Sequence, residues 1–229
     1  MIDDFIRLVV SGSVDEVSRR LAADPALATA SSNGGATRKD ATTFFLDEIG
    51  HYLYRGDTAL HIAAAACRRP VAELLVARGA DCRAKNRRGA EPLHYAADAS
   101  RSSPDAQAET IAYLVSCGAD PAAEDESGVA PLHRAVRTRS LAAVRALVEA
   151  GADPKQPNGN GSTPLHLAVQ PTGRGGSGSE EARRQQAGII RFLIERGARP
   201  ADRDAKGKRV DQAATSEWIR CLLADATCR

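Results

Sequence analysis

Histidine is the side chain best suited to acid–base chemistry in this 229-residue chain, because it titrates near neutral pH. Four of the five histidines share one position in a repeated pattern: His61, His94, His133 and His166. Only His51 lies outside that pattern, and a helix would place it on one face with Asp47 and Glu48. No nucleophile or second acid–base group follows at a recognisable spacing. We therefore predict an exposed helix with a solvated charge pair rather than an enzyme centred on His51.

The five cysteines could bind a metal only if they were clustered. They form no CxxC pair and no Cys/His group at zinc spacing: Cys67, Cys82, Cys117, Cys221 and Cys228. We therefore expect no metal and no cofactor. Acidic residues stand where a secretory signal needs positive charge, and no apolar run approaches the ~20 residues of a membrane helix. We expect a reduced, cytoplasmic monomer that has no membrane contact.

The elements that must position the histidines are encoded by two short sequence motifs that recur together, called here the first and second phrases. The first phrase occurs at residues 57–64 (DTALHIAA), 90–97 (AEPLHYAA), 129–136 (VAPLHRAV) and 162–169 (STPLHLAV). Its histidines are 33, 39 and 33 residues apart. A second phrase consists of an apolar pair followed closely by Gly-Ala. Its glycine lies 18, 24, 18 and 31 residues after the four histidines, in order. The second and fourth units therefore carry insertions, near residues 99–105 and 171–183.

Each phrase predicts one helix of a pair. Thr58 and Thr163 can cap a helix start, and Pro164 fits the first helical turn without losing a hydrogen bond. Glu91 and Ala130 replace that threonine, which should weaken their helices by about 1 kcal/mol each. A glycine after each second helix suits a left-handed terminus. One pair cannot cover its own apolar face, so the pairs must stack.

The two phrases resemble the ankyrin repeat in amino-acid sequence and in their period of ~33 residues. The resemblance implies an all-α solenoid of about six stacked helix pairs, with degenerate terminal pairs and short β-hairpin loops, the fingers, between pairs. It also implies that the four repeat histidines are structural and bridge adjacent hairpins and helices. We expect one domain, residues 1–229, in four consecutive parts: a capping repeat (1–30), an insertion (31–53), four clear repeats (54–202) and a second capping repeat (203–229).

The insertion at residues 31–53, together with the adjacent Tyr54, holds half of the eight Phe and Tyr residues of the chain: Phe44, Phe45, Tyr52 and Tyr54. We expect a short helix folded back to cover the stack. The alternative is an aromatic binding feature near the fingers, since tyrosine is enriched at interfaces. The Gly/Ser-rich residues 174–179 predict a flexible loop.

The net charge of +2 leaves only local electrostatic attraction. One finger is basic (Arg83, Lys85, Arg87, Arg88), the next is acidic (Glu124, Asp125, Glu126), and the following first helix is basic again (Arg134, Arg137, Arg139). Opposite signs on neighbouring fingers largely cancel beyond a Debye length of about 8–10 Å. A nucleic-acid-binding adaptor that uses the Arg-rich finger and inner helix is therefore the alternative, and a protein partner is the favoured expectation.

Ankyrin domains bind through finger tips and the concave face of their first helices, so the resemblance implies a non-catalytic protein-interaction module. Position by position, it carries over to ten residues: Tyr54, Arg55, Arg87, Arg88, Asp98, Glu126, Ser127, Arg137, Asn160 and Gln170.

Overall fold

The computed structural model describes residues 2–99, 103–171 and 178–227, and in these its helices form six consecutive pairs. The first helices of the pairs are α1 (Ile2–Ser11), α3 (Ala59–Ala65), α5 (Pro92–Ala97), α7 (Pro131–Thr138), α9 (Pro164–Ala168) and α11 (Val210–Ala213). The second helices are α2 (Val14–Ala23), α4 (Arg69–Ala77), α6 (Pro104–Ser116), α8 (Leu141–Glu149), α10 (Glu180–Glu195) and α12 (Glu217–Thr227). A short 3-10 helix, η1 (Pro25–Ala28), follows the first pair.

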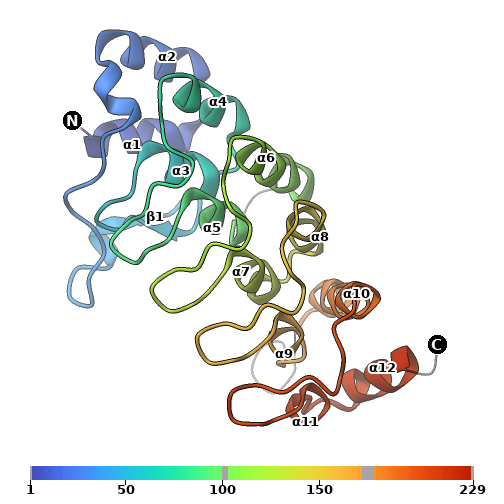
Figure 1. The fold of residues 1–229 in the computed structure, drawn as a ribbon. Helices are drawn as coiled ribbons and strands as arrows, with labels where there is room; N and C mark the ends of the chain where they lie inside the picture. Colours follow the sequence, from blue (N-terminus) through green and yellow to red (C-terminus); the bar gives the residue numbers. More distant parts are fainter. Residues whose placement is uncertain (1, 100–102, 172–177, 228–229) are drawn as a thin grey trace.

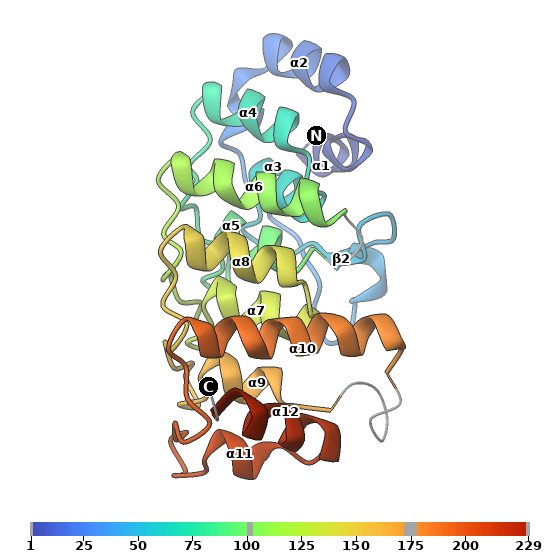
Figure 2. The ribbon, with the colours of Figure 1, turned by 90° about the vertical axis from the view of Figure 1, so that its right-hand side faces the viewer.

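The pairs stack side by side in two layers. Each first helix contacts the first helix of the next pair, and each second helix contacts the next second helix. Figure 2 shows α2, α4, α6, α8, α10 and α12 following one another down the stack. Between the layers, the leucines of the first phrase (Leu60, Leu93, Leu132, Leu165) and of the second phrase (Leu75, Leu114, Leu147, Leu193) are all buried. This elongated apolar interior confirms the predicted all-α solenoid.

The fingers project from one side of the stack (Figure 1), and four of their tips have the same construction. Each tip begins with an Asn or Asp whose Oδ1 accepts hydrogen bonds from the backbone N–H groups two and four residues later: Asn86, Asp125, Asn158 and Asp204. Such side-chain bonds stabilise a tight turn. A glycine with a positive φ of 67° to 76° completes each tip.

Adjacent tips are joined by backbone hydrogen bonds. Arg87 N–H donates to the Arg55 carbonyl at 2.9 Å, and Glu126 N–H donates to the Arg88 carbonyl at 2.9 Å. The Gly159 N–H continues this series to the Gly128 carbonyl at 3.0 Å. The turn at Arg55 and the tips that begin at Asn86, Asp125 and Asn158 therefore form one connected row.

The insertion at residues 31–53 is not the predicted helix. It contains a single 3-10 turn, η2 (Thr42–Phe44), and two short antiparallel strands, β1 (Phe45–Leu46) and β2 (His51–Tyr52). The four residues that link the strands, 47–50, form a turn and not a helix. Asp47 and Glu48 are exposed in this turn and do not share a helix face with His51. The expectation that the segment folds back onto the stack is met, since Leu46, Ile49 and Leu53 are buried.

The two later insertions lengthen second helices. The helix α6 has 13 residues and α10 has 16, whereas α4 and α8 have nine each. Ser103 and Ser179 cap the two long helices, each accepting from the backbone N–H three residues later at 3.2 Å. Most of the predicted flexible loop at residues 174–179 lies outside the described residues.

Candidate binding face

The first helices and the fingers together form one continuous surface, which we call the inner face, and the insertion is folded onto part of it. The repeat histidines hold this surface together. Each ring Nδ1 accepts a hydrogen bond from the backbone N–H three residues earlier, at 3.1 to 3.2 Å. Each Nε2 must then carry the proton, and it donates to a carbonyl of the next finger at 3.0 to 3.1 Å: Ala90, Val129, Gln156 and Lys208.

Burial favours the neutral form of three of these rings. It lowers the pKa of His94 to about 4, and it also lowers the pKa values of His61 and His133. A neutral ring is what the geometry requires, because Nδ1 must accept while Nε2 donates. These histidines therefore have both ring nitrogens committed to the backbone.

His51, in contrast, fastens the insertion to the inner face. Its Nδ1 lies 2.9 Å from the Tyr52 carbonyl, and its Nε2 lies 3.2 Å from Oδ1 of Asp98 at the end of α5. Its ring also stacks on Tyr95 with centroids 4.2 Å apart. Burial alone lowers the pKa of His51, but Asp98 and the Tyr52 carbonyl outweigh it and raise the pKa above its usual value.

The two contacts of His51 decide what its ring can do. Nδ1 faces the Tyr52 carbonyl and Nε2 lies within ion-pair distance of the Asp98 carboxylate, so the doubly protonated imidazolium is the form that both contacts favour. In that form the ring offers no lone pair to take a proton from a substrate, which a general base must do. The prediction of an exposed, solvated His51 paired with Asp47 or Glu48 is therefore wrong: the ring is largely buried, and its partner is Asp98, which is distant in sequence.

An ion-pair chain continues from Asp98 across the inner face. Arg134 on α7 donates from Nη1 to Asp98 at 3.1 Å and from Nη2 to Asp125 at 2.8 Å. Burial acts to raise the pKa values of Asp98 and Asp125. The contacts of Asp98 with His51 and Arg134, and the contact of Asp125 with Arg134, outweigh burial and lower both pKa values. With a protonated His51, the chain of four groups is balanced in charge.

A second buried network lies beneath the insertion. Asn86 Nδ2 donates to Asp57 Oδ1 at 2.8 Å and to Tyr95 Oη at 2.9 Å. The Tyr95 hydroxyl in turn donates to the Asp57 carboxylate at 2.8 Å, and Asp57 also accepts the Tyr54 N–H at 2.6 Å. Burial raises the pKa of Tyr95 well above its usual value. The network joins Tyr54, which follows the insertion, to Asn86 of the basic finger and to Tyr95 of α5.

The insertion and the fingers enclose a cavity of about 390 Å³ on the inner face. The insertion contributes Gly50, His51 and Tyr52 to its lining, the adjacent Tyr54 also lines it, and α7 contributes Arg134 and Arg137. From the finger side come Arg88, Asp125 and Ser127. The cavity is within the size range of small-ligand and side-chain pockets.

Five of the ten residues predicted to contact a partner line this cavity: Tyr54, Arg88, Asp98, Ser127 and Arg137. Asp98 differs from the other four because its carboxylate is already paired with His51 and Arg134. The other five are exposed on the fingers or after α9 and do not line it: Arg55, Arg87, Glu126, Asn160 and Gln170. Of these, Arg87 is partly committed, because its guanidinium donates to the Ala36 carbonyl of the insertion.

The residues whose buried contacts the sequence analysis did not predict are Asp57, Tyr95 and Arg134, although it counted Arg134 among the basic residues of its helix. A signal for two of them was present. The position after each repeat histidine holds Ile62, Tyr95, Arg134 and Leu167, so a phenol and a guanidinium replace aliphatic side chains at a mostly buried site. A polar group at such a position needs a partner.

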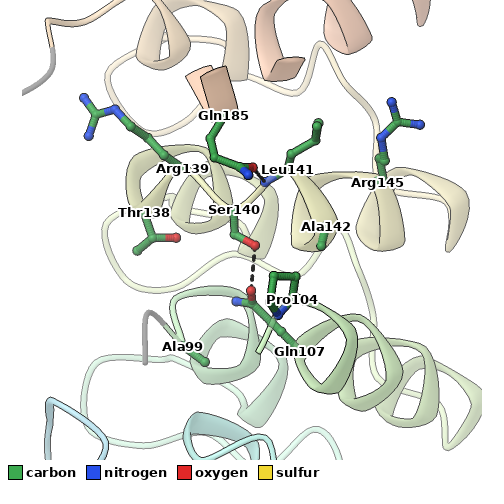
Figure 3. Close-up of a pocket in the computed structure, with 10 residues that line it drawn as sticks. All are labelled: Ala99, Pro104, Gln107, Thr138, Arg139, Ser140, Leu141, Ala142, Arg145 and Gln185. Carbon is green, nitrogen blue, oxygen red and sulfur yellow. Dashed lines mark hydrogen bonds between the residues drawn. The ribbon is translucent and has the colours of Figure 1, made fainter. Parts of the chain in front are cut away.

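A second cavity, of about 400 Å³, lies beside the start of α8, where the longer helices α6 and α10 extend past it (Figure 3). Four of its lining residues are joined in pairs by hydrogen bonds. Ser140 Oγ donates to Gln107 Oε1 at 2.6 Å, and the Leu141 N–H donates to Gln185 Oε1 at 3.3 Å. We therefore place the candidate site on the inner face.

Within the described ranges, no cluster of three His, Cys, Asp or Glu side chains is arranged to hold a metal ion. Nor does any helix in the same ranges have the length and apolar character needed to span a bilayer.

Comparison with known families supports the repeat assignment. A family model described as ankyrin repeats (3 copies) matches residues 27–125 and 93–204, which together span more than half of the chain. Comparison with curated proteins gives no match.

Proposed function

Because the chain belongs to the ankyrin-repeat family, we propose that it is a non-catalytic module that binds another protein through its inner face and finger tips. The observation that carries this proposal is the cavity of about 390 Å³, which is bordered by the exposed side chains of Arg88, Ser127 and Arg137. Arginine and tyrosine, both present here, are enriched where proteins meet. The paired nitrogens of His51 argue against a catalytic base at this place.

The charge arrangement disfavours the nucleic-acid alternative. Arg134 is paired with Asp98 and Asp125, and the exposed Glu126 stands on the finger after the basic one. A phosphate backbone needs a continuous row of unpaired cations. We further propose a cytoplasmic monomer, which suits the free thiols of Cys82, Cys117 and Cys221.

The test is site-specific photo-crosslinking in the native host with the full chain. A photoreactive amino acid replaces Ser127 or Asn160 on the fingers, and the control carries it at Arg191, which is exposed on the second-helix layer. We expect the same protein to be captured from both finger positions and not from Arg191. Capture that is equal at all three positions, or capture only from Arg191, would refute binding through the inner face.

A further inference from the structure

In the described part of the chain, two cations of the cavity on the inner face have no carboxylate as counter-ion. Among the described residues, neither Arg88 nor Arg137 forms an ion pair, and both are exposed. Arg134, only three residues before Arg137, is by contrast held between two carboxylates at 3.1 and 2.8 Å. Arg134 is therefore a structural residue of the cavity, whereas Arg88 and Arg137 can pair with a bound anion.

The net charge of the lining follows from these pairings. The chain of His51, Asp98, Arg134 and Asp125 is neutral when His51 is protonated. Arg88 and Arg137 then leave an excess of two positive charges in a cavity of about 390 Å³. The site is therefore suited to one or two negative charges, whereas its own two carboxylates would repel a longer polyanion.

Aromatic surface lies beside the two free cations. Tyr52 is 38% exposed, which makes it one of two large hydrophobic side chains exposed in the described part of the chain, and Phe45 supports its ring at a centroid distance of 4.8 Å. Next to it, the Arg88 guanidinium lies over the Tyr54 ring, 4.8 Å from the centroid. This stacking fixes the position of the Arg88 charge and reduces the entropy that it loses on binding.

We propose that this cavity binds a side-chain carboxylate from an acidic segment of a partner protein, with Arg88 and Arg137 as its counter-ions and Tyr52 against an apolar neighbour of that carboxylate. This proposal rests on the proposed function and specifies the chemistry of the partner. A guanidinium forms directed, charge-assisted hydrogen bonds with a carboxylate, which are stronger than bonds between neutral groups.

The test uses the full chain and two fluorescein-labelled pools of short peptides. In one pool two adjacent central residues are glutamate, in the other they are glutamine, and both have the same randomised apolar and polar flanks. Fluorescence anisotropy measures binding at constant salt. We expect the glutamate pool to bind at least about tenfold more tightly, as expected for a charge-assisted bond. Equal binding of the two pools, or no binding of either, would overturn the proposal.

Three variants locate the effect. Arg88→Gln and Arg137→Gln should each weaken binding of the glutamate pool by about tenfold. Arg137→Lys should restore part of the loss, and the matched control Arg191→Gln should bind like the unaltered protein. Thermal unfolding followed by circular dichroism checks that each variant is folded. Glutamate-pool affinities of Arg88→Gln and Arg137→Gln that equal that of Arg191→Gln would overturn the assignment.

Two further outcomes separate this proposal from the proposed function. If a variant with both Arg88→Gln and Arg137→Gln is still crosslinked to the same protein from Ser127 and Asn160, the protein-binding function stands and the carboxylate site is wrong. If a single-stranded oligonucleotide displaces the glutamate pool with an affinity that falls steeply with salt, the face binds nucleic acid and both proposals fail.

Discussion

Lowering the pH from about 7 to about 5 should reduce the free energy of unfolding by about 2 kcal/mol through His94 alone. Burial lowers the pKa of His94 to about 4 in the folded chain, whereas an unfolded histidine has a pKa of about 6.5. Between these two values the unfolded chain binds a proton that the folded chain does not. Stability is therefore lost as the pH falls through about 6.5, and the loss levels off below about 4.

The structural reason is the direction of the hydrogen bonds at His94. Its Nδ1 accepts the Glu91 N–H at 3.1 Å, and a proton on Nδ1 would place two donors against each other. His61 and His133 should act in the same direction, since burial lowers their pKa values as well. His51 opposes them in part, because its raised pKa gives a contribution that is present at low pH and is lost as the pH rises through its folded pKa.

Urea unfolding followed by circular dichroism at both pH values measures the effect, with His94→Gln as the informative variant. Glutamine does not titrate, so this variant should be less stable at neutral pH but lose about 2 kcal/mol less than the unaltered protein on acidification. If both proteins show the same difference between the two pH values, His94 is not the group responsible and the burial argument is wrong.

Three other substitutions test packing and hydrogen bonding, each by urea unfolding. Tyr95→Phe removes the hydroxyl that donates to buried Asp57 and should cost about 1–3 kcal/mol. Ala130→Thr supplies the hydroxyl that elsewhere bonds the repeat histidine and should add about 1 kcal/mol; a loss of stability would show that the site has no room for it. Gly161→Ala should reduce the free energy of unfolding by at least about 1 kcal/mol more than Gly207→Ala. The two glycines have similar φ values, +73° and +76°, but of the two only Gly161 has backbone of the next finger within 2.4 Å of an added Cβ. Equal losses of stability would exclude that contact.

The stack was predictable because its signals are local and repeated. Leu60, Leu93, Leu132 and Leu165 recur in phase with the histidines, and one apolar interior is the arrangement that buries all of them. The positions of the helix starts follow from the prolines at residues 92, 131 and 164, each of which begins its helix.

The insertion could not be predicted in the same way. Its strands are two residues long, too short for a strand pattern to stand out from the sequence. The partner that fixes His51 is Asp98, which lies on another repeat and is charged like the nearer Asp47 and Glu48. The choice among these carboxylates depends on tertiary packing. The cavity depends on the same packing, although the resemblance did indicate several of the residues around it.

The two buried networks make the resistance of the solenoid to force unequal along its length. They join the insertion, the basic finger, α5 and α7 by side-chain bonds through Asp57, Tyr95 and Arg134. Within the described C-terminal part, the last fingers are linked by fewer such bonds, including His166 to Lys208 at 3.1 Å. Because contacts in a repeat stack act between neighbours, a chain pulled from both ends in optical tweezers should extend first at α11 and α12, and last at the units clasped by the insertion.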